Sequence, residues 1–439
     1  MPETKARIGK IKRVSSGRSV SSPKTMVREA PRYHIGGIRL QAVVFLLSFL
    51  IVWSRRPDAI LNAQFFAEDG AVFYRAAYEM GFRSFPVIYG GYVHLLLRLV
   101  AMLALLVPFS LAPLVMNMCA IVVQILPVNI FLSSRFSHIG LGVRLLGSFL
   151  YLALPNSFEI HANITNGQWH LALAACLLLL AQPASNIAWK IFDVTVMVLT
   201  SFSSPMGILL LPIAAALWWK RRRRWSAVSL AALLPGVLVE TLTAILSQSR
   251  QAPNGVTFER FLGIIGGQVF FSCLFGMKTA AAFTLRGLFP YAVAAALVGG
   301  AAVIYAFFSA PLELRAFLAF SFAVLGLGLA RPQAGLPEQL DWGVFLVPGL
   351  CNRYYFLPML AFLASLVWIA AFSYSRRVLR HAALAILLLL PIGIFKDWRY
   401  PAFGDYHFQR YADRFELAPS GTKLVIPINP AWHMELTKR

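Results

Sequence analysis

Long apolar runs separated by short polar stretches occupy the chain from Gln41 to Phe395. A helix that crosses a membrane needs about 20 mostly apolar residues, and runs of about this length recur throughout the region. The pattern predicts an all-α polytopic membrane protein. The expected spans are 39–54, 112–132, 144–158, 169–184, 187–203, 205–219, 226–246, 288–309, 314–331, 354–374 and 380–396.

Two further apolar stretches, 93–107 and 261–282, have an ambiguous pattern, and the charges between them favour one arrangement. If neither stretch crosses, Arg135, Arg144, Lys190 and the basic run 220–224 all face the same side. Cytoplasmic loops carry an excess of basic residues, so we expect that side to be the cytoplasm. The prediction is about 11 transmembrane helices, with a range of 10 to 13, and both stretches along the outer interface or partly inserted into it.

Composition supports this assignment. Hydrophobic residues make up 58% of the chain and charged residues 13%, which excludes an ordinary soluble domain. The net charge of +22 is concentrated at membrane edges. We predict a disordered basic cytoplasmic tail (1–38), a transmembrane domain (39–396) whose first outer loop covers 55–113, and a short outer C-terminal segment (397–439). The tail is interpreted as a topological and lipid-binding element in preference to a nucleic-acid-binding one.

Glu68 and Asp69, in the first outer loop, are the most informative polar pair. They precede an amphipathic helix expected over 71–82, where one acid could simply act as the N-cap. Capping uses only one acid, so the other is a candidate general base close to the membrane surface.

His94 and Arg98 follow at a spacing of four residues, which would place them on one face of a helix expected over 92–107. Both are candidates to bind an anion. Snorkelling of Arg98 to the interface is the structural alternative.

The loop from Glu159 to His170 is short but unusually polar. Amide, imidazole and indole groups suit the hydroxyls and the apolar face of a sugar ring. Helix capping by Asn166 and interfacial anchoring by Trp169 are the alternatives. The candidate sugar-binding residues are His161, Asn163, Asn166, Gln168 and Trp169.

Arg353, followed by Tyr354, begins an apolar span on the outer side, where a basic residue opposes the usual charge distribution. A lipid phosphate is a natural counter-ion because a guanidinium group binds two phosphate oxygens at once. A local salt bridge to Glu338 or Asp341 is the alternative.

Together these residues resemble the GT-C superfamily of polytopic glycosyltransferases, which use polyprenyl-phosphate-linked sugars. The resemblance is carried by the acid pair in a large first outer loop, by Arg353-Tyr354, and by residues 425–436, which are similar to the outer tail of a bacterial subgroup. It implies an inverting transfer with Glu68 or Asp69 as base. Arg353, with Arg98 as a further candidate, would hold the phosphate.

The expected partners are a polyprenyl-phosphate sugar donor, a glycolipid or cell-surface glycan acceptor, and membrane lipid, with no nucleic acid. We expect the protein in the inner (cytoplasmic) membrane and predict no cofactor, leaving a divalent metal open because no convincing third ligand is visible. A transporter or flippase of lipid-linked sugars and a polysaccharide polymerase are the alternative functions. A structural scaffold is a further one.

Overall fold

The computed structural model describes residues 37–246, 253–280, 287, 289–332, 341–373 and 376–439, and every structural statement below concerns these residues. The chain divides into 1–33 and 34–439, and the second part is the one described here. The basic tail predicted over 1–38 lies almost wholly outside the described residues.

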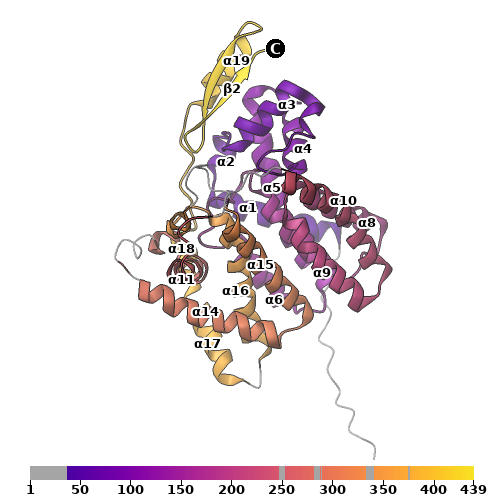
Figure 1. Ribbon diagram of the computed structural model, residues 1–439, viewed down its shortest axis with the longest axis vertical. Helices are drawn as coiled ribbons and strands as arrows, with labels where there is room; N and C mark the ends of the chain where they lie inside the picture. Colours follow the sequence, from indigo (N-terminus) through magenta and orange to yellow (C-terminus); the bar gives the residue numbers. More distant parts are fainter. Residues whose placement is uncertain (1–36, 247–252, 281–286, 288, 333–340, 374–375) are drawn as a thin grey trace, which may run out of the picture. The chain divides into compact units, whose positions relative to one another are not determined.

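Within the described ranges, eleven helical segments run between two sets of connections (Figure 1). The eleventh consists of two consecutive helices. The segments are α1 (Ile38–Arg55), α5 (Ala112–Leu132), α6 (Leu141–Leu152), α7 (Gly167–Leu180), α8 (Ile187–Ser203), α9 (Met206–Arg221), α10 (Arg224–Leu246), α14 (Phe289–Ser309), α15 (Leu312–Ala330), α16 (Asn352–Phe372), and α17 (Arg377–Leu387) with α18 (Leu390–Lys396).

One set of connections, here called the site face, consists of the described parts of 56–111, 153–166, 204–205, 247–288, 331–351 and 397–439. Arg55, at the end of α1, donates hydrogen bonds to the carbonyls of Leu152 (2.6 Å), Leu154 (2.9 Å) and Asp397 (3.2 Å). Three segments that are distant in sequence therefore end at the same level.

The opposite set, here called the basic face, consists of the described parts of 133–140, 181–186, 222–223, 310–311 and 373–376. Arg135 donates to the carbonyl of Gln182 at 2.7 Å. Arg221 donates to the carbonyl of Leu179 at 2.8 Å and pairs with Glu313 at 2.9 Å. The loops that the charge pattern grouped together are thus brought together by contacts.

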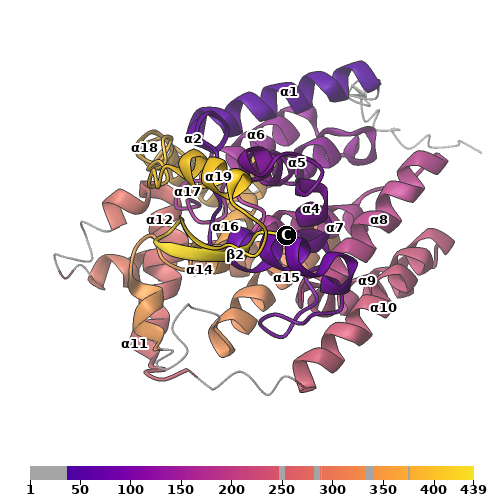
Figure 2. The ribbon, with the colours of Figure 1, turned by 90° about the horizontal axis from the view of Figure 1, so that it is seen from above.

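Burial separates the central helices from the peripheral ones. In the most apolar stretch of α16, 72% of residues are buried inside the protein, compared with 22% for α1. Figure 2 shows α16 and α7 inside the bundle and α1 and α10 at its edge. Peripheral helices that expose leucine and isoleucine in this way need an apolar environment, because such a surface is unfavourable in water.

Within the part of the chain that the structure describes, 8 helices are long and apolar enough to cross a membrane. Two expected spans are shorter than the sequence suggested: α6 ends at Leu152 and α7 at Leu180, where the chain leaves the helical conformation. The first ambiguous stretch forms α4 (Leu95–Ala104), whose 10 residues cover only about 15 Å. It is therefore too short to cross.

The second ambiguous stretch, 261–282, lies mostly in the helical run 258–275, and its residues 281 and 282 lie outside the described residues. This run is long enough to cross but does not connect the two faces. It comprises α11 (Phe258–Leu262), η5 (Gly263–Phe271) and α12 (Ser272–Phe275). Near its start Arg260 pairs with Asp341; just after its end the amide of Met277 donates to Asp397 at 2.6 Å. Both partners lie on the site face, so this continuous helical segment begins and ends at that face and does not connect the two faces, as the charge pattern predicted.

The first loop contains α2 (Asp58–Leu61), η1 (Asp69–Tyr74), α3 (Arg75–Met80), η2 (Gly81–Ser84), α4 and η3 (Phe109–Leu111). Short helices η4 (Ser134–Phe136) and η6 (Trp342–Leu346) lie in other connections. The helix expected over 71–82 is present as the consecutive η1 and α3, and it ends at Gly81, whose φ is 57°. Its buried residues Phe73, Tyr74 and Ala77 face the protein.

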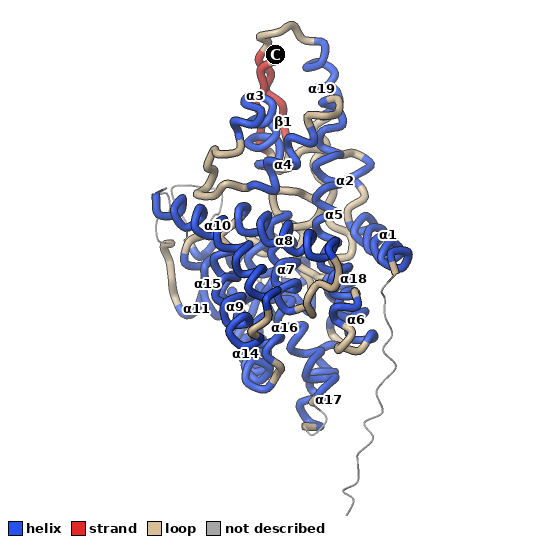
Figure 3. Tube along the Cα trace, turned by 90° about the vertical axis from the view of Figure 1, so that its right-hand side faces the viewer, coloured by secondary structure: helices blue, strands red, loops and turns tan. Residues whose placement is uncertain are grey.

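The C-terminal segment folds into α19 (Phe408–Leu417) and an antiparallel hairpin of β1 (Lys423–Ile428) and β2 (Trp432–Thr437), which the sequence reading did not anticipate. Figures 1 and 3 show the hairpin and α19 beside α3 at one end of the helices. The amide of Ala67 donates to the carbonyl of Asn429 at 2.5 Å, and the amide of Asn429 donates to the carbonyl of Phe65 at 3.2 Å. The hairpin therefore fixes the backbone directly before the acid pair.

Candidate functional site on the site face

The acid pair does not cap the helix that follows it. Glu68 occupies the N-cap position of η1 but has helical backbone angles, and its side chain accepts no capping hydrogen bond. Asp69 is the first residue of η1 and its carboxylate is directed to another segment. The capping interpretation of these acids is therefore wrong, and their side chains need another explanation.

Asp69 is completely buried. The hydroxyl of Thr165 donates to its Oδ1 at 2.5 Å, whereas Oδ2 has no hydrogen-bond partner among the described residues. Burial raises the pKa of Asp69 to about 7. The hydrogen bond from the Thr165 hydroxyl lowers the pKa, the charge of Glu68 raises it, and the backbone amides of Thr165 and Ile164 lower it further. A carboxylate that titrates near neutral pH and has an unpaired oxygen is suited to accept a proton.

Glu68 is half-buried beside it and lies within electrostatic range of Arg353. Burial raises the pKa of Glu68, and the guanidinium of Arg353 lowers it. The structure thus brings Glu68, the neighbour of Asp69, near the arginine at the start of α16, about 285 residues later in the chain.

Arg353 forms an ion pair with Glu159. Its backbone amide also donates to Glu159 Oε2 at 3.1 Å, and its guanidinium lies 5.0 Å from the centroid of the Tyr354 ring. The local salt bridge considered from the sequence is different from the one observed: Asp341 pairs with Arg260, and Glu338 lies outside the described residues.

The amides expected to bind sugar instead build the 159–170 loop. The side-chain amides of Asn163 and Asn166 both donate to the carbonyl of Glu159, at 2.7 and 2.9 Å. The Oδ1 of Asn163 also accepts a hydrogen bond from the backbone amide of Asn166 at 3.0 Å. His161 contacts the side chain of Gln124 at 3.1 Å and the carbonyl of Val52 at 2.9 Å. All three predicted side chains are buried, so their role here is to hold the loop that carries Thr165 and Glu159.

Gln168 and Trp169 retain unpaired polar atoms. Gln168 Oε1 and Trp169 Nε1 are buried with no hydrogen-bond partner among the described residues. The Trp169 ring meets the Tyr354 ring edge-on at 5.5 Å, which connects the start of α7 to the start of α16. Of the predicted sugar-binding residues, these two are the ones whose polar groups stay unpaired.

His94 and Arg98 do not share a helical face. His94 lies before α4 in a left-handed conformation (φ 59°), and its Nε2 contacts the carbonyl of Tyr89 at 3.0 Å. Arg98 donates to the backbone carbonyls of Val93, at 2.8 Å, and Val87. The guanidinium therefore closes the 87–93 turn, and the predicted paired anion site is not formed.

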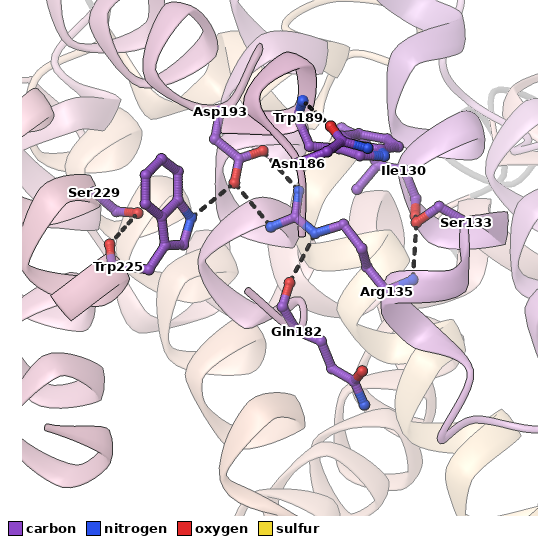
Figure 4. Close-up of polar contacts among 9 residues, drawn as sticks. All are labelled: Ile130, Ser133, Arg135, Gln182, Asn186, Trp189, Asp193, Trp225 and Ser229. Carbon is purple, nitrogen blue, oxygen red and sulfur yellow. Dashed lines mark hydrogen bonds and ion pairs between the residues drawn. The ribbon is translucent and has the colours of Figure 1, made fainter. Parts of the chain in front are cut away.

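Two acids that lie within predicted spans, Asp193 and Glu240, have structural partners. The Asp193 carboxylate accepts hydrogen bonds from the two terminal guanidinium nitrogens of Arg135, at 2.6 and 2.8 Å, and from the indole nitrogen of Trp225, at 3.1 Å (Figure 4). The Glu240 carboxylate accepts a hydrogen bond from the backbone amide of Val93 at 3.3 Å. Neither acid contacts the acid pair.

Within the described residues, no group of three or more His, Cys, Asp and Glu side chains is arranged to hold a metal ion.

Sequence reasoning missed the roles of Thr165 and Glu159, although both lie in the polar loop that it selected. Thr165 is the hydrogen-bond donor to Asp69, and Glu159 is the ionic partner of Arg353. The available signal was that Glu159 is the sole carboxylate of that loop, which made it the natural partner for a cation on the same side.

These features define a polytopic helical membrane protein with two neighbouring carboxylates and an arginine on one face. No protein-family model matches the chain, and no curated protein is similar to it in sequence. Among solved structures, the Archaeoglobus fulgidus oligosaccharyltransferase tethered with an acceptor peptide has a TM-score of 0.42 and 12% identity, covering 86% of this chain and 57% of that one. Its apo form has a TM-score of 0.41 and 10% identity, covering 87% and 58%. This chain thus spans little more than half the length of those proteins, and the likeness is too low to carry a functional argument.

Proposed function

We propose that this protein transfers a sugar from a polyprenyl-phosphate donor to a hydroxyl group of a membrane glycolipid or cell-surface glycan. The observation that supports this most directly is Asp69, a buried carboxylate with a pKa of about 7 and an unpaired oxygen, beside Glu68 and near Arg353. The sequence resemblance to GT-C glycosyltransferases points in the same direction.

In the proposed reaction, Asp69 Oδ2 accepts the proton of the acceptor hydroxyl as its oxygen attacks the anomeric carbon. The bond between that carbon and the phosphate oxygen breaks, and polyprenyl phosphate leaves with the electron pair. Because a phosphate is a good leaving group, the reaction needs one base and a cation for the departing charge. Arg353 is the proposed cation, and a single displacement inverts the anomeric centre.

Two contacts seen in the structure must change before this reaction can occur. Asp69 is fully buried, so the side chains that cover it must move when the acceptor binds. Arg353 already pairs with Glu159, so a donor phosphate must share or replace that carboxylate. Such an exchange is favourable in a site shielded from water, where a guanidinium binds phosphate through two parallel hydrogen bonds.

The charge distribution gives the proposed orientation. The basic face carries Arg135, Arg221 and the run 222–224, and positive-inside asymmetry assigns it to the cytoplasm. The acid pair then lies on the outer side of the cytoplasmic membrane. A transporter would need polar groups along a path between the faces. The Asp193–Arg135 pair near the basic face is instead closed by its own hydrogen bonds.

The test uses the purified full-length chain in vesicles, a panel of labelled hexoses on polyprenyl phosphate, and a glycolipid extract as acceptor. Asp69→Asn should lower the transfer rate by about 10²–10⁴-fold, the usual contribution of general base catalysis. Asp413→Asn, at an exposed position of α19, removes the same charge and should retain full activity.

Three outcomes would contradict the proposal. Full activity of Asp69→Asn together with an inactive Glu68→Gln would transfer the role of base to Glu68. Movement of the labelled lipid across the membrane without sugar transfer would indicate a flippase. Products of increasing length would indicate a polymerase.

A further inference from the structure

A tight turn, Tyr89-Gly90-Gly91-Tyr92, holds a tyrosine beside the acid pair. The backbone amides of Tyr89 and Tyr92 each donate to the carbonyl of the other at 3.0 Å. Gly90 and Gly91 have φ values of 55° and 88°. A two-residue hairpin turn with positive φ at both central residues favours glycine there, so the Gly-Gly sequence determines this turn.

Contacts from two helices fix the turn in place. Arg98, in α4, donates to backbone carbonyls on both sides of it, and His94 Nε2 contacts the carbonyl of Tyr89 at 3.0 Å. From α10, the hydroxyl of Thr243 donates to the carbonyl of Gly91 at 3.1 Å. A half-exposed side chain that is held this firmly is suited to binding, because little conformational entropy remains to be lost.

The turn directs Tyr89 to the segment that carries the two acids. The Tyr89 ring meets the Phe73 ring edge-on, with the centroids 5.9 Å apart. Phe73 belongs to η1, which begins at Asp69. Tyr89 also lies within electrostatic range of Glu68. The acid pair and Tyr89 therefore border the same part of the site face.

Tyr89 and Glu68 have complementary hydrogen-bonding roles. Burial raises the pKa of Tyr89 to about 12, and the charge of Glu68 raises it further. The phenol therefore keeps its proton at neutral pH and can donate, whereas a carboxylate can only accept. A hydroxyl group accepts and donates at once, so it fits between them. A phosphate oxygen would be repelled by Glu68.

In the proposed reaction Asp69 takes the proton of the reacting hydroxyl, so a hydroxyl between Glu68 and Tyr89 must be a second one. A hexose ring carries hydroxyls on adjacent carbon atoms and can present one to each of the two neighbouring acids. We infer that Tyr89 is a specificity-determining residue that, with Glu68, binds the acceptor-sugar hydroxyl next to the one that reacts. This inference rests on the proposed function, but the binding itself requires no transfer.

The experiment measures binding by saturation-transfer NMR on the full-length chain in nanodiscs, with methyl glucoside, methyl galactoside and methyl mannoside as probes. Tyr89→Phe keeps the ring that packs on Phe73 and removes only the hydroxyl. It should weaken binding of the preferred hexoside about tenfold, the usual effect of losing one hydrogen bond. Tyr411→Phe removes a tyrosine hydroxyl at a half-exposed position of α19 and should bind like the wild type.

Monodeoxy analogues of the preferred hexoside identify the contact. The analogue that lacks the bound hydroxyl should bind equally weakly to wild type and Tyr89→Phe, because the same interaction is missing in both. The other analogues should still distinguish the two proteins. In the transfer assay, Tyr89→Phe should raise KM for the acceptor and leave kcat and KM for the donor unchanged.

Three results would overturn the inference: no binding of any of the hexosides to the wild type, equal binding by Tyr89→Phe, or the same loss in Tyr89→Phe with every deoxy analogue. Hexoside binding that depends on Tyr89 but is accompanied by no transfer would refute the proposed function alone. The sugar-binding role of Tyr89 would then still stand.

Discussion

Replacing Asp69 with asparagine should stabilise the protein at neutral and alkaline pH while it removes activity. Burial raises the pKa of this carboxyl from 3.8 to about 7 in the folded chain. The folded state therefore holds a proton that the unfolded state releases between these two values. The stability that the protonated Asp69 carboxyl contributes is fully present below pH 3.8 and is lost as the pH rises toward 7.

The magnitude follows from that shift. A difference of about three pKa units corresponds to about 4 kcal/mol, at 1.36 kcal/mol per unit. Asparagine carries no charge at any pH, so the variant avoids this loss. The Thr165 hydrogen bond reduces the gain by about 1–2 kcal/mol, because a hydroxyl bonds a carboxylate more strongly than an amide. We expect Asp69→Asn to gain about 2–3 kcal/mol at about pH 8.

The measurement is thermal unfolding of the purified protein in detergent at a series of pH values between about 4 and 8. The difference between Asp69→Asn and wild type should be small at the acidic end, grow with pH and level off above about pH 7. Asp413→Asn, on the exposed surface of α19, serves as the charge control and should show no such growth. A difference that is constant with pH, or a variant that is less stable at about pH 8, would refute the assignment of a raised pKa to Asp69.

Three further predictions concern residues that contact buried charged groups. Thr165→Val removes the side-chain hydrogen bond that lowers the pKa of Asp69. The pH at which transfer activity rises should therefore increase by about one pH unit. An unchanged pH profile would exclude Asp69 as the titrating base. Asp193→Asn leaves the buried Arg135 guanidinium without its carboxylate and should destabilise the protein by about 3–5 kcal/mol. Trp225→Phe, which removes the single indole hydrogen bond to Asp193, should cost about 1 kcal/mol by the same unfolding measurement.

The helical framework was accessible from the sequence because crossing a membrane imposes a long apolar run and an uneven distribution of basic residues. Loop charges placed 258–275 on one face, and the contacts of Arg260 and Met277 agree. Helix ends were less predictable. Apolar residues such as Leu154 continue past the end of α6 because they are buried inside the protein, and burial by protein or by lipid selects the same side chains.

The site was predictable as a set of regions but less so as individual residues. The acid pair and Arg353 stand out because charged residues are rare near an apolar core, and Glu68 lies within electrostatic range of Arg353. Asn163 and Asn166 were assigned to a ligand, yet they form hydrogen bonds within their own loop. A sequence shows which polar groups are present, but whether the chain itself satisfies them depends on backbone geometry that spacing does not encode.

The hydrogen bonds between Asn429 and residues 65–67 have a consequence for biogenesis. The segment preceding the acid pair emerges early from the ribosome, but its backbone partner is synthesised about 360 residues later, roughly 20–70 s at typical elongation rates. During that interval the first loop lacks the strand that fixes its geometry, even though most spans can already be inserted. Membrane integration and maturation of the acid pair are therefore separate events, and the first loop gains its final arrangement only after Asn429 has been synthesised.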